Sequence, residues 1–87
     1  MAMQFEYPVK LTIDKHDGGF VVTCRDLPEA ITQGNDKAEA LDQAEGAVQA
    51  ALEGRIADRL DIPKSSELKR GEVLATVPVS TAMKAAL

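Results

Sequence analysis

Aromatic side chains are scarce in this sequence, which has two Phe, one Tyr and no Trp. Apolar residues nevertheless make up 45% of the chain, enough for a globular fold. The core must therefore be built mainly from Val, Leu, Ile and Ala. With 87 residues the chain has room for one domain, residues 1–87, and a core of that size is modest.

Cysteine and histidine are almost absent, with Cys24 and His16 the only ones. A single cysteine cannot form an internal disulfide, which indicates a protein that is intracellular or at least indifferent to redox conditions. A zinc site needs several such ligands, so no metal or cofactor is expected. We interpret Cys24 as a small buried residue in a strand and His16 as a solvated turn residue, and we assign no catalytic residue.

Long hydrophobic runs are also missing. No segment approaches the ~20 apolar residues that a membrane-spanning helix needs. The N-terminus does not show a charged region followed by a long apolar stretch, so no signal peptide is predicted. We therefore expect a cytoplasmic protein.

The charge is acidic overall but unevenly distributed. The net charge is −4; residues 1–53 carry ten acids and four bases, whereas residues 54–87 carry four acids and six bases. Phosphate contacts require clustered Lys and Arg, so we expect no DNA binding by these residues. The acidic part suits a basic protein partner, although the acids could serve solubility alone.

Alternating apolar and polar residues predict three strands in the first third of the chain, at 5–14, 20–25 and 30–33. Asp17, Gly18 and Gly19 form the first turn, because these residues tolerate the positive φ angles of a tight hairpin. Pro28 makes the second turn a rigid corner, since it fixes its own φ and restricts Leu27 to an extended conformation.

A helix is predicted from Lys37 to about Arg59. Asp36 is a good N-cap, and Glu39, three residues later, completes a capping box. Residues at helical spacing form an apolar stripe of Leu41, Ala44, Val48, Ala51 and Leu52. An acidic stripe flanks it and contains Asp42, Glu45 and Glu53. A fourth strand is predicted at 73–79, followed by the start of a second helix at Thr81.

This element order predicts an α+β domain of two layers, ββ-β-α-β. Because crossover connections are right-handed, we expect strand four to lie beside strand one and parallel to it, in the sheet order 3-2-1-4. Such a sheet is the first half of a ribonuclease-H-like fold. A two-metal nuclease on that fold needs converging carboxylates. Asp14, Glu39 and Asp42 do not supply them, so a vestigial nuclease is the weaker alternative.

The segment at 26–34, DLPEAITQG, has the distinctive pattern D-L-P-x-x-x-T-x-G. Other short segments accompany it: YPV at 7–9, GGFVV at 18–22, EAL at 39–41 with Ala44, IP at 62–63, SS at 65–66 and VPVS at 77–80. With these segments the chain resembles the HicB antitoxin family over residues 5–84, and the segment at 26–34 is the most specific part of the match.

The resemblance implies an N-terminal domain with a partial ribonuclease-H-like fold that binds and blocks HicA, a small basic ribonuclease toxin that cleaves mRNA. In the family a C-terminal domain binds DNA and dimerises. The chain ends at Leu87, so that domain is expected to be absent, and DNA contact is expected only through it. A homo-oligomer and a partner other than HicA stay open. For toxin contact we predict Asp26, Pro28 and Glu29, then Asp42 and Glu45.

Overall fold

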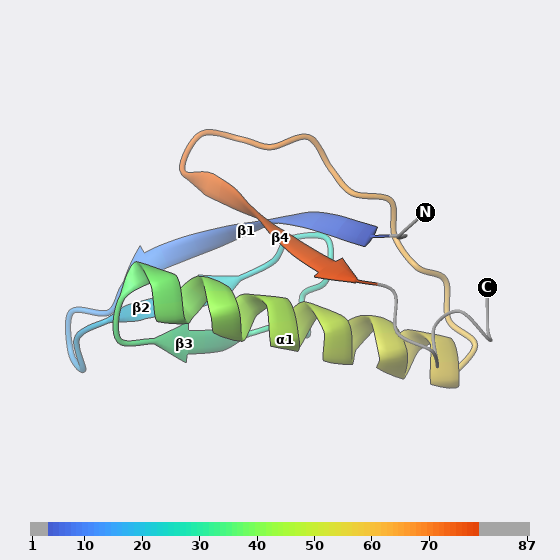
Figure 1. Cartoon of the computed structure of the whole chain (residues 1–87), viewed down its shortest axis with the longest axis horizontal. Helices are drawn as coiled ribbons and strands as arrows, with labels where there is room; N and C mark the ends of the chain where they lie inside the picture. The colour runs from blue at the N-terminus through green and yellow to red at the C-terminus, as the bar shows by residue number, and fades with distance from the viewer. Residues whose placement is uncertain (1–3, 79–87) are drawn as a thin grey trace.

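The computed structural model describes residues 4–78 and contains four strands and one helix (Figure 1). Their bounds are β1 Gln4–Ile13, β2 Phe20–Thr23, β3 Thr32–Gly34, α1 Lys37–Ala57 and β4 Glu72–Pro78. The four predicted strands and the first predicted helix are thus present, with ends that shift by at most two residues. The predicted second helix from Thr81 lies outside the described residues.

The four strands form one sheet in the order β3-β2-β1-β4, which confirms the predicted α+β class and strand order. Every neighbouring pair is antiparallel. The expected parallel pairing of strand four with strand one is therefore wrong. Instead β4 runs antiparallel to β1, with Gln4 opposite Pro78 and Lys10 opposite Glu72. In this respect the sheet departs from a ribonuclease-H-like one.

The connection after the helix explains the reversed direction. A helix of 21 residues spans about 31 Å. The fourteen residues 58–71 that follow it can span about 46 Å when extended. They return along the molecule to the end where the helix began (Figure 1), and β4 then runs in the same direction as α1. The right-handed crossover rule does not apply, because it concerns parallel strands only.

The core lies between α1 and one face of the sheet. It is mainly aliphatic, as expected, and Tyr7 is its one aromatic member with almost no exposure. The helix contributes Ala44, Val48 and Leu52 as predicted. Leu41 and Ala51 are only partly buried, and Ala40 is fully buried instead. Small residues on this stripe allow the helix to lie close to the sheet.

The first turn of α1 is fixed by its cap. Asp36 accepts a hydrogen bond from the Glu39 backbone N–H at 2.8 Å, and Glu39 in turn accepts one from the Asn35 N–H at 3.3 Å. Such contacts satisfy backbone donors that the helix itself leaves unpaired. Gly34, directly before this cap, is buried. A Cβ atom on Gly34 would lie only 2.3 Å from the Ala40 backbone nitrogen. The close approach of β3 to the helix therefore requires glycine.

Candidate partner-binding surface

The corner between β2 and β3 has a buried side and an exposed side. Leu27 is 0% exposed and Ala30 is buried, and both belong to the core. The Ala30 N–H donates to the Leu27 carbonyl at 2.9 Å and closes the turn between them. Pro28 and Glu29, at the tip of this turn, are exposed. The motif thus anchors the corner through its apolar residues and presents the two residues between them to solvent.

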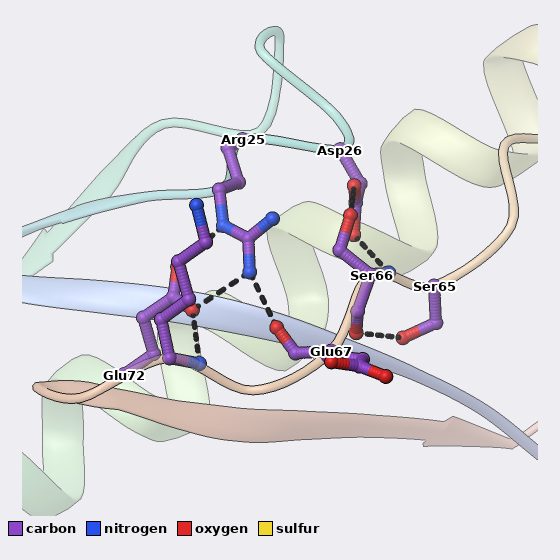
Figure 2. A network of polar contacts seen from close by, with 7 residues as sticks. Arg25, Asp26, Ser65, Ser66, Glu67 and Glu72 are labelled. Atoms are coloured by element: carbon purple, nitrogen blue, oxygen red, sulfur yellow. Dashed lines mark hydrogen bonds and ion pairs between the residues drawn. The ribbon is translucent and has the colours of Figure 1, made fainter.

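Asp26, the first residue of the motif, is held by the connection between α1 and β4. Its carboxylate accepts a hydrogen bond from the Ser66 N–H at 2.9 Å and a second, short one from the Ser66 hydroxyl (Figure 2). Asp26 is also half-buried. Both acceptor oxygens of this predicted contact residue therefore already have partners within the chain.

Arg25 makes a second attachment to the same connection. Its Nε and Nη2 donate to the two carboxylate oxygens of Glu72 at 2.9 and 3.0 Å, and Nη2 also donates to the Glu67 carbonyl at 2.5 Å (Figure 2). The hydrogen bonds from Arg25, with one from the Lys69 N–H, lower the pKa of the Glu72 carboxyl to about 2. Since β1 lies between β2 and β4, this ion pair spans the central strand.

Glu29 is paired with the last turn of the helix. The Arg55 guanidinium donates to its two carboxylate oxygens at 2.6 and 3.0 Å, and a third bond of 3.3 Å reaches the Asp61 carbonyl. The hydrogen bonds from Arg55 hold the pKa of Glu29 below its ordinary value. The exposed tip of the corner therefore carries a carboxylate whose charge is compensated by Arg55.

The two acids predicted on the helix lie apart from the corner. Asp42 is exposed and Glu45 is half-buried. They precede Arg55, the partner of Glu29, by thirteen and ten residues, so the separations along the helix axis are about 20 and 15 Å. In the described part of the chain neither acid takes part in an ion pair. The structure thus brings Asp26, Pro28 and Glu29 together but not with Asp42 and Glu45.

Four residues that organise the corner were not predicted as such: Arg25, Arg55, Ser66 and Glu72. Their partners are 26 to 47 positions away in the sequence. Pairs at such separations leave no periodic pattern in a single sequence. The Ser65-Ser66 dipeptide was noticed only as part of the family resemblance, without a role.

Two further groups that could carry chemistry, Cys24 and His16, lie where the sequence predicts them. Cys24 is buried, as predicted, and burial raises the pKa of its thiol. A protonated, inaccessible thiol is a poor nucleophile. His16 is exposed in the hairpin turn, also as predicted. Residues 4–78 contain no group of three or more His, Cys, Asp or Glu side chains that could hold a metal ion.

The helix of the described region is too polar to cross a membrane.

Comparison with known proteins gives a consistent result. A family model described as the HicB-like antitoxin of bacterial toxin–antitoxin systems matches residues 6–86. Antitoxin HicB of Escherichia coli K12 is 40% identical over 81 residues, which is 93% of this chain and 58% of that protein. Antitoxin HicB 2 of Photorhabdus laumondii is 38% identical over 87 residues, all of this chain and 60% of that protein. The chain thus spans about three-fifths of these relatives.

Proposed function

Because the chain belongs to the HicB-like antitoxin family of bacterial toxin–antitoxin systems, we propose that it neutralises a HicA-type toxin that cleaves mRNA. The observation that carries this proposal is the family match over residues 6–86. In the proposed mechanism the domain binds the toxin and covers its active site, and it performs no catalysis itself. It would act in the bacterial cytoplasm, where mRNA is present.

The charge distribution supports a basic partner. Residues 1–53, which include the corner and most of α1, carry a balance of −6. Complementary charge mainly accelerates the encounter between two proteins. Asp42 and Glu45 are the better candidates for this effect, because Glu29 is already compensated by Arg55. We therefore assign the attraction of the toxin chiefly to the acids of the helix.

The corner between β2 and β3 is suited to making the complex long-lived. Pro28, Glu29 and Ile31 project from a turn whose backbone is fixed by the buried Leu27, and Ile31 is 63% exposed. A rigid, partly apolar projection loses little conformational freedom on binding, which favours a long-lived complex. Asp26 contributes indirectly, since it fastens the corner to Ser66. We propose that Pro28 and Glu29 make direct toxin contacts that determine the dissociation rate.

Binding kinetics with an immobilised HicA-type toxin, at low and high salt, test the role of the helix. Asp42→Lys combined with Glu45→Lys should slow association, and the loss should shrink at high salt because ions screen exposed charges. Asp58→Lys combined with Asp61→Lys is the matched control: it changes the net charge equally, on exposed residues outside the helix. Equal slowing by both pairs would contradict a specific role for the helix acids.

A second pair of variants tests the corner. Pro28→Ser combined with Glu29→Gln should raise the dissociation rate and weaken inhibition in an RNA-cleavage assay. Arg55→Gln is the control, because it breaks the same ion pair without changing the exposed tip. If the control dissociates as fast, the effect is one of corner geometry and not of contact. If the chain neither binds nor inhibits any HicA-type toxin, the proposed function is wrong.

A further inference from the structure

The outer edge of β4 is a strand edge to which no other strand of residues 4–78 pairs. It is seven residues long, whereas the opposite edge of the sheet, β3, has three. Exposed edges are usually protected by charged side chains or proline. Glu72 is the only charged residue of β4, and Arg25 already pairs with it. Pro78 protects only the end of the strand, so the middle of this edge is available for pairing.

Prolines show which backbone groups face this edge. Residues in an antiparallel pair alternate between hydrogen-bonded and non-bonded positions. Pro8 opposes Leu74 and Pro78 opposes Gln4. Since proline has no N–H, both pairs fit the non-bonded positions. The Glu72 N–H follows the same alternation, because it donates to the Lys69 carbonyl at 3.0 Å.

It follows that Leu74 and Thr76 direct their N–H and C=O groups away from β1, toward the free edge. Two large aliphatic side chains of this edge strand are also exposed, Val73 by 41% and Leu74 by 40%. Because side chains alternate along a strand, Val73 lies on the face that carries Ala75 and Val77, and Leu74 lies on the opposite face with Thr76. Leu74 also lines a groove of about 660 Å³ together with Phe5 and Ile62. The edge therefore combines free backbone donors with one exposed leucine, Leu74, at the centre of the strand.

We propose that two copies of this chain associate by pairing their β4 strands antiparallel, around a two-fold axis beside Leu74. In this register Leu74 opposes Leu74 of the other copy and Glu72 opposes Thr76. Both free N–H groups of each copy then find carbonyl acceptors, and the two exposed leucines pack together. No like charges face each other. A two-fold contact of this kind uses the same surface on both subunits and closes at the dimer.

Charge favours a second copy over a basic toxin at this edge. The exposed Lys69 and Arg70 precede β4, and Lys64 lines the adjoining groove. These bases would repel a basic partner that docks on this edge. A second copy brings the same bases, but the two-fold register keeps them away from each other. In the proposed register Arg70 opposes Pro78 of the other copy. The two Arg70 residues are then about 27 Å apart, well beyond the screening length of about 8 Å at physiological salt.

Sedimentation and light scattering of the full 87-residue chain measure the association. The mass should rise from 9.3 kDa to twice that value with increasing concentration. Leu74→Lys places like charges opposite each other, and Thr76→Pro removes one donor from each copy while sparing the ladder with β1. Each should raise the dissociation constant by roughly tenfold or more. The control Ile13→Lys, at a 66% exposed residue outside the β1–β4 ladder, should leave it unchanged.

Disulfide trapping tests the register. Leu74→Cys should form a linked dimer under mild oxidation, because directly opposed Cα atoms lie about 5.5 Å apart, within disulfide range. Thr76→Cys should not, because the two copies of residue 76 would be about 14 Å apart. The native Cys24 is buried and should not interfere.

Four results would overturn the proposal. The first is a parent chain that stays monomeric at high concentration, and the second is a dimer that neither Leu74→Lys nor Thr76→Pro weakens. The third is trapping at residue 76 but not at residue 74. Displacement of the dimer by a HicA-type toxin, with toxin binding lost in Leu74→Lys, would likewise assign this edge to the toxin instead. Circular dichroism of each variant confirms that the fold is kept.

Discussion

Gly34→Ala is expected to destabilise the domain strongly, although it adds a single methyl group. The new Cβ would lie 2.3 Å from the Ala40 nitrogen, 2.5 Å from the Ala40 Cα and 2.8 Å from the Glu39 carbonyl carbon. Ordinary contact begins near 3.4 Å. All three atoms belong to the backbone of α1, so no side chain can rotate away. The first turn of the helix must move by about 1 Å or the strand must leave it.

Overpacking of this kind costs about 1–3 kcal/mol and occasionally more. We expect the upper part of that range, because the obstruction is backbone. For a domain of this size each kcal/mol lowers the melting temperature by about 4–8 °C, so the loss should be on the order of 10–20 °C. Gly34 does not have a positive φ, so backbone strain adds nothing to this cost.

Gly46→Ala is the matched control, since it is the same substitution with no atom within 4 Å of the added Cβ. Gly46 is exposed in the interior of α1, where alanine is favoured over glycine by about 0.5–1 kcal/mol. The control should therefore stabilise the domain. Urea unfolding followed by far-ultraviolet circular dichroism measures both changes. If Gly34→Ala were as stable as the parent, the close packing of β3 on α1 would be refuted.

Two further predictions concern the corner and its attachment. The pKa of Glu72 is lowered from 4.5 to about 2 in the folded chain. The stability that Glu72 contributes is therefore complete above about pH 4.5 and is lost as the pH falls toward 2. The difference in unfolding free energy between the parent and Glu72→Gln should shrink over that range, and a constant difference would contradict the Arg25 ion pair. Leu27→Ala should lower the free energy of unfolding by about 2–5 kcal/mol, because the side chain is fully buried. Pro28→Ala should lower it by no more than about 1 kcal/mol. If thermal unfolding showed equal losses of stability for the two variants, the corner would not be anchored through Leu27.

The parts of this fold that could be predicted are those with local causes. Alternation around Val9 identifies a strand, and the Asp36–Glu39 capping box identifies the start of the helix to the residue. The direction of β4 has no local cause. It depends on how far residues 58–71 travel, and their polar composition is compatible with either direction. The parallel strand was predicted by assuming a right-handed crossover after the helix, whereas residues 58–71 return to the end of the molecule where α1 begins (Figure 1).

The candidate surface was predictable to a smaller extent. The exposure of Pro28 and Glu29 follows from their place at a turn, and that of Asp42 from its place on the polar side of a helix. Sequence reasoning could not show that Glu29 is bound to Arg55 or Asp26 to Ser66, because those contacts depend on the tertiary fold. The acids of the corner were therefore treated as free charges, which they are not.

This difference changes how the acidic charge of the chain bears on partner binding. A carboxylate that is paired within its own chain must give up or share that partner before it can bind another cation, which reduces any gain from the new contact. Glu29 and Asp26 are in that position, whereas Asp42 and Glu45 have no ion pair in residues 4–78. The association rate of a complex should then depend mainly on the helix, and its dissociation rate mainly on the corner. The internal pairs have a separate consequence, because they hold the corner in one conformation before any partner binds. The conformational entropy of the corner is therefore lost during folding, and binding does not require a further loss.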